Sequence, residues 1–181
     1  MTQRRIYQDE CPYFITTNTH NREWFFADGK YALALYKIII EACRIKHFDL
    51  LAFCILPEHL HLMAQKNAGA DYSRTLEKVR WDWDKQNYHF ININPSAQRG
   101  LSSLRGFTIS DLLQSIKGNF SRKIHIGNIW QSRFNSRFVN TEKRFENTLN
   151  YILYNYQKHN LPGKYSVYPY QYINNKLINC Q

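Results

Sequence analysis

Two histidines separated by one residue, His59 and His61, are the side chains whose type and spacing point most directly to metal chemistry. In an extended strand, successive side chains point to opposite faces, so both imidazoles would project from the same face. A neutral imidazole is a common ligand for divalent metals, and two from one strand leave positions for a third protein ligand, water and a phosphate oxygen. A His-x-His pair can equally be the polar face of an ordinary strand, and the tripeptide alone favours that interpretation.

The segment from Asn140 or Thr141 to about His159 predicts a helix that carries a second set of reactive side chains. A phenol can attack phosphorus, an amide one turn later can reach a metal, and cations on the same face can hold phosphates. The chain has 13 tyrosines, so spacing by itself does not separate Tyr151 from an ordinary exposed tyrosine. The helical period places Phe145, Leu149, Ile152, Leu153 and Tyr156 on a core-facing side, and Arg144, Asn147, Tyr151, Asn155 and Lys158 on the nearly opposite side.

The elements that must position these residues can be predicted from the periodicity of apolar side chains. Thr108 and Asp111 form a plausible N-terminal cap for a helix that precedes the last strand. The alternation of strands and helices is that of the split βαβ pattern. We therefore predict an α+β, ferredoxin-like antiparallel sheet with helices on one face, plus a C-terminal helix that carries the candidate nucleophile. The predicted order is a strand over 11–17, a helix over 29–46, strands over 49–56 and 59–65, a helix from about 108, a strand over 129–139 and the last helix.

The chain length of 181 residues favours one domain over residues 1–181, because it suits one well-buried core and is short for two. Residues from about 67 to 107 are less regular and are interpreted as an insertion in that domain. Within it, residues 72–88 are charged and suggest an exposed helix, while 92–106 contain proline, serines and glycines typical of a loop.

A formal charge of +10 and a pI near 9.5 point to a polyanionic partner, of which nucleic acid is the commonest. Charge alone does not separate DNA from RNA or from an anionic membrane surface. No apolar stretch approaches the length of a membrane span, and the first residues are polar, so we expect a cytoplasmic protein with no membrane partner. Four widely spaced cysteines without a CxxC pair predict reduced thiols.

Four short blocks of the sequence resemble one known family. Leu56–Leu62 resembles the HUH signature (histidine, bulky hydrophobic residue, histidine) of the single-tyrosine transposases, and especially of the REP-associated tyrosine transposases. Ser115–Gly118, Ile129–Phe134 and Tyr151–Asn155 resemble further blocks of that family in the same order. Together the blocks extend over residues 7–159, and four of them in order on the predicted elements are far more specific than HUH alone.

The resemblance implies roles for four residues. His59 and His61 would bind Mg²⁺ or Mn²⁺, Tyr151 would attack DNA, and Asn155 would complete the metal site. The chain would then be a metal-dependent transposase that cleaves single-stranded DNA beside a hairpin, leaving a 5′-phosphotyrosine and a free 3′-OH. Relatives include monomers and homodimers, and the sequence leaves both states open. The family usually has proline directly after this asparagine and glycine at the end of the block, where this chain has Tyr156 and Asn160, so the turn that ends the helix is expected to differ.

Single-stranded DNA suits the remaining basic and aromatic residues. Cations can track phosphates, and aromatic rings can stack on unpaired bases. Trp130 and Phe134 are the aromatic candidates, although core packing is the better interpretation for at least one of them. The candidate phosphate ligands, besides Arg144 and Lys158 of the last helix, are Lys117, Arg122, Lys123, Arg133 and Arg137.

Two other functions remain open at this point. A replication or mobilisation nickase would use the same chemistry, but it would usually carry a helicase or oligomerisation domain that this sequence lacks. A catalytically inactive HUH-like or RRM-like module would bind nucleic acid reversibly on the same kind of sheet, although the aromatic motif expected of RRM binders is not evident.

Overall fold

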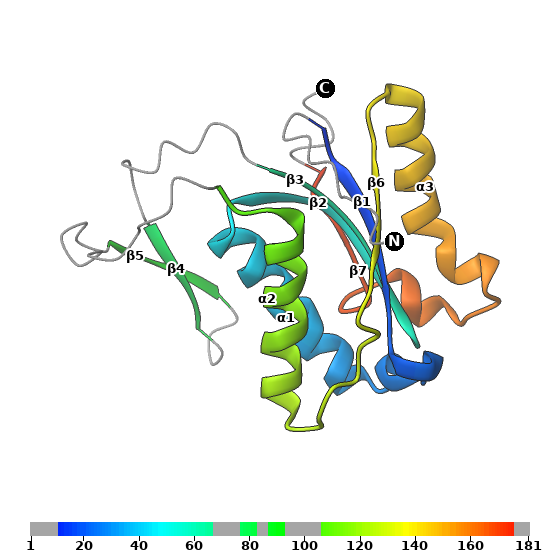
Figure 1. Ribbon diagram of the computed structural model, residues 1–181, viewed down its shortest axis with the longest axis horizontal. Helices are drawn as coiled ribbons and strands as arrows, with labels where there is room; N and C mark the ends of the chain where they lie inside the picture. The colour runs from blue at the N-terminus through cyan, green and yellow to red at the C-terminus, as the bar shows by residue number, and fades with distance from the viewer. Residues whose placement is uncertain (1–10, 67–76, 83–86, 93–105, 176–181) are drawn as a thin grey trace, which may run out of the picture. The chain divides into compact units, whose positions relative to one another are not determined.

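The computed structural model describes residues 11–66, 77–82, 87–92 and 106–175. Its centre is a five-stranded antiparallel sheet with the strand order β6-β1-β3-β2-β7 (Figure 1). The first four strands in this order reproduce the ferredoxin-like arrangement, which confirms the predicted α+β fold class. The strands are β1 (Tyr13–Asn18), β2 (Phe48–Leu56), β3 (His59–Lys66), β6 (Asn135–Phe138) and β7 (Gln171–Ile173).

Helices cover both faces of the sheet. Helices α1 (Gly29–Ile45) and α2 (Ile109–Ile124) pack on one face and contact each other, whereas α3 (Glu142–Lys158) lies on the other face (Figure 1). Among the described residues, short 3₁₀ turns occur at His20–Arg22, Phe25–Ala27 and Gly163–Ser166.

The pleat of the strands divides the core into two layers, because alternate side chains go to opposite faces. The α1 and α2 layer contains a large apolar cluster that includes Ile15, Phe53 and Leu62. The smaller α3 layer includes Met63 and Ile152. The prediction that His59, His61 and Met63 share one face of β3 agrees with this division, since Leu60, Leu62 and Ala64 all belong to the α1 and α2 cluster.

Polar side chains fix where α2 and α3 begin. Thr108 Oγ1 accepts a hydrogen bond from the backbone N–H of Asp111, and the Asp111 carboxylate accepts one from the N–H of Thr108, so the predicted cap of α2 is a complete capping box. Thr141 caps α3 by accepting from the N–H of Arg144. At the other end of the chain, Gln171 of β7 donates from Nε2 to the backbone carbonyl of Leu153 at 2.9 Å, which ties α3 to the sheet edge.

Several predicted elements differ from those observed. The prediction of a last strand over 129–139 is wrong over much of that length. The described strand is limited to Asn135–Phe138, and Trp130 makes an isolated bridge to Thr19. The suggested helix over 72–88 is also wrong. That region contains β4 (Glu77–Asp82) and β5 (Asn87–Asn92), which pair as an antiparallel hairpin. Of the predicted loop over 92–106, residues 93–105 lie outside the described residues.

The chain separates into two compact units by its internal contacts. One unit contains residues 1–68 and 107–181, and the other contains residues 69–106. The second unit nearly coincides with the segment interpreted as an insertion, and its reading as an insertion in one transposase domain remains a proposal. Among the described residues, no helix is long and apolar enough to cross a membrane.

Candidate functional site

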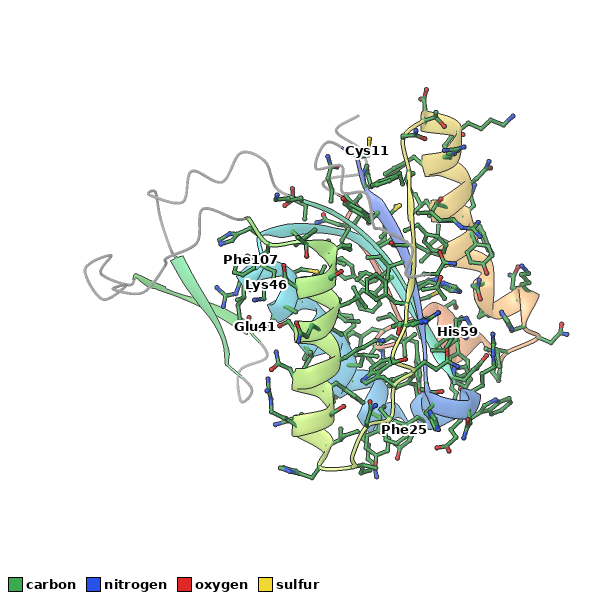
Figure 2. All side chains as sticks on the ribbon, in the orientation of Figure 1. Cys11, Phe25, Glu41, Lys46, His59 and Phe107 are labelled. Carbon is green, nitrogen blue, oxygen red and sulfur yellow. The ribbon has the colours of Figure 1, made fainter. Side chains whose placement is uncertain are left out.

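The two histidines lie side by side on the face of β3 that α3 covers, as Figure 2 shows for His59. Each has only 4% of its surface exposed, and their Nε2 atoms are 3.1 Å apart. Their register neighbours are Asn18 and Thr16 on β1. Because the strand period is two, the position of one ring fixes the side on which the other lies.

The second nitrogen of each ring is held by a partner. His59 Nδ1 is 3.0 Å from Glu58 Oε1, and His61 Nδ1 is 2.8 Å from Thr16 Oγ1. When Nδ1–H donates to these oxygens, Nε2 carries a free lone pair, which is the form that binds a metal. The ring of Phe14 stacks on His61 with centroids 5.3 Å apart and fixes its orientation further.

Burial favours the uncharged form of both imidazoles. Burial lowers the pKa of His59, with the neighbouring His159 and Arg22 adding to the effect and Glu58 opposing it. Burial, reinforced by the neighbouring His59, lowers the pKa of His61 to about 3. A pair that stays neutral does not have to lose protons before it binds a cation near pH 7.

Helix α3 brings Tyr151 to this pair within the same chain. The centroid of its half-buried ring is 5.1 Å from that of His61 and 5.8 Å from that of Phe14. The ammonium group of Lys158 lies 4.9 Å from the centre of the Tyr151 ring. The phenol therefore stands beside the imidazoles, with a positive charge close to it.

Asn155 lies one turn after Tyr151 and is 1% exposed. Neither its side-chain oxygen nor its nitrogen has a hydrogen-bond partner among the described residues. A buried amide without partners is costly, so it usually marks a place where another group binds. The helix contacts the histidine pair on both sides of Asn155, since Tyr151 meets His61 and His159 meets His59 with ring centroids 5.3 Å apart.

This donor set fits a divalent cation. Two neutral imidazole nitrogens and an amide oxygen left without a partner are ligands that Mg²⁺ and Mn²⁺ accept, with room for water and phosphate. In the part of the chain that the structure describes, no group of three or more His, Cys, Asp and Glu residues could hold a metal. A third protein ligand, if present among these residues, would be of another type, such as Asn155.

Sequence reasoning missed three supporting residues and placed one incorrectly. Glu58 and Thr16 orient the imidazoles, and His159 packs on His59. The spacing of eight between Tyr151 and His159 was an available signal, because it spans two turns of one helix face. Asn155 was predicted on the side away from the core, yet it is buried, because α3 turns that side partly towards the sheet.

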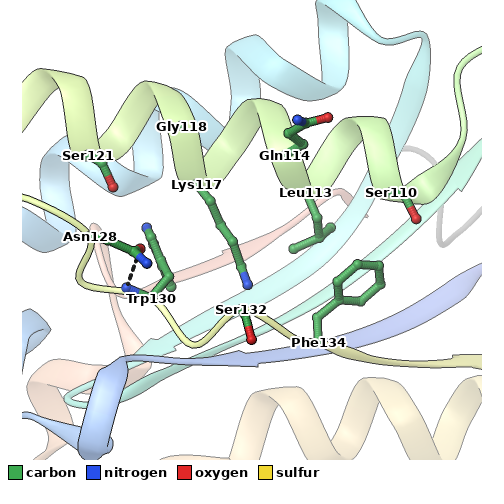
Figure 3. Close-up of a pocket in the computed structure, with 10 residues that line it drawn as sticks. All are labelled: Ser110, Leu113, Gln114, Lys117, Gly118, Ser121, Asn128, Trp130, Ser132 and Phe134. Atoms are coloured by element: carbon green, nitrogen blue, oxygen red, sulfur yellow. Dashed lines mark hydrogen bonds between the residues drawn. The ribbon is translucent and has the colours of Figure 1, made fainter. Parts of the chain in front are cut away.

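The predicted phosphate ligands do not form one cluster. Lys117 on α2 donates from Nζ to the backbone carbonyl of Gln131 at 2.7 Å across a cavity of about 310 Å³, so this amine also links two segments (Figure 3). Arg122 and Arg144 each donate to a neighbouring asparagine on their own helix or its cap. The remaining candidates, Lys123, Arg133, Arg137 and Lys158, are exposed.

The two aromatic candidates also differ from each other. Trp130 is 2% exposed and packs against Phe26 and Phe120, so core packing is the correct interpretation for it. Phe134 is partly buried and lines the cavity in Figure 3.

Known proteins that are similar to this chain are DNA transposases. The family described as "Transposase IS200 like" matches residues 7–93, a stretch that includes both histidines. The resemblance predicted from the sequence is therefore confirmed: residues 7–93 match the IS200-like transposase family, and this match implies a DNA-cleaving enzyme.

Two individual relatives are described as REP-associated tyrosine transposases, one of them as putative. The chain is 25% identical over 167 residues to the REP-associated tyrosine transposase of Escherichia coli (strain K12), covering 92% of this chain and 79% of that protein. It is 26% identical over 131 residues to a putative REP-associated tyrosine transposase of Haemophilus influenzae (strain ATCC 51907 / DSM 11121 / KW20 / Rd), covering 72% of this chain and 61% of that protein.

A solved structure shares the fold. It is that of a REP-associated tyrosine transposase bound to a REP hairpin, with a TM-score of 0.65 and 24% sequence identity. The match covers 94% of this chain and 81% of that one.

Proposed function

We propose that this protein is a metal-dependent transposase that cleaves and rejoins single-stranded DNA beside hairpins, with Tyr151 as the nucleophile. The observation that carries the proposal is the contact between the Tyr151 ring and His61, which joins a phenol to a pair of neutral imidazoles. The relative solved with a REP hairpin supports a hairpin substrate. Since all these side chains belong to one chain, the proposed site is complete without a second copy, and a homodimer is compatible with it.

His59, His61 and Asn155 would hold the cation, Mg²⁺ or Mn²⁺. When bound, it would supply positive charge that polarises the scissile phosphate and neutralises charge developing on it. Glu58 and Thr16 would keep the two Nε2 atoms directed at it by accepting hydrogen bonds from Nδ1–H.

The Tyr151 oxygen would form a bond to phosphorus while the bond from phosphorus to the 3′ oxygen breaks. The phenol proton passes to solvent, and the leaving 3′ oxygen takes up a proton to become a free 3′-OH. The 5′-phosphotyrosine retains the energy of the broken phosphodiester, so a 3′-OH can reverse the step and no ATP is needed for rejoining.

Basic side chains would hold the DNA around this centre. Lys158 lies against the Tyr151 ring and is close enough to contact a phosphate attacked by that tyrosine. The exposed residues Lys123, Arg133 and Arg137, with Lys117, Arg122 and Arg144, would neutralise phosphates further along the strand.

The proposal is tested with an end-labelled DNA hairpin carrying single-stranded arms, incubated with Mn²⁺ and then denatured. We expect a covalent protein–DNA adduct that Tyr151→Phe abolishes. The matched control is Tyr154→Phe, which changes an exposed tyrosine on the same helix and should leave the adduct intact. Reversible binding that is insensitive to Tyr151→Phe would instead support the inactive nucleic-acid-binding module.

A further inference from the structure

The turn over residues 20–24 is fixed beside the histidine pair but takes no part in the proposed chemistry. Thr19 donates from its N–H and from Oγ1 to the carbonyl of Glu58, at 2.8 and 3.0 Å. Phe26 donates from its N–H to the carbonyl of Pro57 at 2.8 Å. Glu58 also contacts His59, so one residue is hydrogen-bonded both to the turn and to the proposed metal site. Figure 2 shows Phe25 and His59 at the same end of the sheet.

Trp24 on this turn presents a large aromatic ring to solvent. Its exposed fraction is 67%, whereas that of Trp130 is 2%. Among the described residues, the Trp24 ring makes no ring contact and no side-chain hydrogen bond. Tryptophan is usually well buried, because its ring removes much apolar surface from water. A ring left exposed next to a reactive centre therefore has surface available for a ligand.

Arg22 provides a positive charge on the same turn. Its side chain is exposed and forms no ion pair within the described part of the chain. The backbone is also unusual, because Arg22 has a φ of 54° without being glycine. Such a conformation costs energy and persists only where the surroundings impose it, here the hydrogen bonds around Thr19.

We propose that this turn is a platform for the unpaired DNA strand at the cleavage site, with Trp24 stacking on one nucleobase and Arg22 binding a backbone phosphate. The proposal rests on the proposed function, because Glu58 links the turn to the histidine pair beside which Tyr151 would attack the DNA. Every base offers a flat π-face, so stacking on tryptophan recognises an unpaired base of any sequence. A guanidinium matches the geometry of a phosphate group through paired N–H donors.

The first test measures affinity for the hairpin used above, in the Tyr151→Phe background so that no cleavage occurs. Trp24→Ala is expected to weaken binding about tenfold, and Trp24→Phe to retain most of the affinity. Val167→Ala is the control, because it removes exposed apolar surface from a residue that is 57% exposed and belongs to a different loop. Arg22→Gln should weaken binding to every sequence and reduce the dependence of affinity on salt. Circular dichroism melting establishes that each variant is folded.

The second test locates the stacked base. Bases in the single-stranded arms are removed one at a time, and Trp24→Ala is compared with its parent on each abasic strand. We expect one position at which the loss caused by Trp24→Ala disappears, because the base that stacks is already absent. Equal binding by Trp24→Ala and its parent on the intact strand, or a loss that persists at every abasic position, overturns the platform.

The outcome also separates this inference from the proposed function. If the chain with Tyr151 forms the adduct and Trp24→Ala changes nothing, the platform fails while the transposase chemistry stands. If the chain neither forms an adduct nor binds the hairpin, both proposals fail together.

Discussion

The two faces of β3 differ sharply in chemistry although they are built from alternate residues of one strand. Leu60, Leu62 and Ala64 are buried in the apolar layer under α1 and α2. His59 and His61 are equally buried under α3, but there they meet hydrogen-bond partners and a half-buried phenol. The buried amide of Asn155 on α3 has no hydrogen-bond partner among the described residues. One face therefore contributes stability, while the other keeps polar groups in a low-dielectric environment where they suit a cation.

The largest expected effect is on the α3 face. His61→Ala should reduce Mn²⁺ affinity and adduct formation by at least about 100-fold, because it removes one of two imidazole ligands from the proposed site. Isothermal titration with Mn²⁺ alone measures the first effect without reference to activity. The control is His125→Asn, which changes an exposed histidine whose φ of 55° asparagine tolerates. Unchanged Mn²⁺ binding by His61→Ala would remove the functional distinction between the two faces.

The opposite face should respond in stability and not in chemistry. Leu62→Ala is expected to lower the free energy of unfolding by about 2–5 kcal/mol, since Leu62 is fully buried and leaves a cavity in the larger layer. Urea denaturation measures this loss. The molecules that remain folded should bind Mn²⁺ with the parent's affinity, and a parallel loss of affinity would mean that the two layers are coupled.

One substitution at Asn155 separates the effect on metal binding from the effect on stability. Asn155→Leu should leave the metal-free protein as stable as its parent or raise its free energy of unfolding by about 1 kcal/mol, because the buried amide has no partner to lose. The same change should reduce the stabilisation that Mn²⁺ confers on the parent. Thermal melting with and without Mn²⁺ measures both effects. A large destabilisation without metal would indicate that the amide has a structural role.

The smallest expected effect concerns the cap of α2. Hydrogen bonds from the backbone and side chain of Thr108 lower the pKa of the Asp111 carboxyl. A lowered pKa means that its contribution is present above the unfolded value and is lost as the pH falls through the folded value. Asp111→Asn should thus lower the free energy of unfolding by about 0.5 kcal/mol at pH 7, with no difference from the parent near pH 2. Urea denaturation at both pH values tests this, and a difference that is independent of pH would exclude a role for the charge.

Much of the fold was predictable because local periodicity reports it. Strand alternation identified the face shared by His59 and His61, and the cap residues Thr108 and Thr141 marked where α2 and α3 begin. The short strand β7 was not predicted, because three residues without alternation carry no periodic signal. The charged segment that contains β4 suggested an exposed helix for a related reason. Charged residues are compatible with the exposed face of a helix and with that of a strand.

The features of the candidate site likewise divide into those that the sequence predicts and those that it does not. The sequence by itself determined that two imidazoles stand side by side on one strand and that Tyr151 and Asn155 lie one turn apart on one helix, because these relations lie within single elements. Only the tertiary structure decided that this helix packs over those imidazoles, that Asn155 is buried, and that Trp130 is in the core while Trp24 is exposed. Such relations depend on how separate elements pack, and packing depends on long-range contacts that no local pattern of residues specifies.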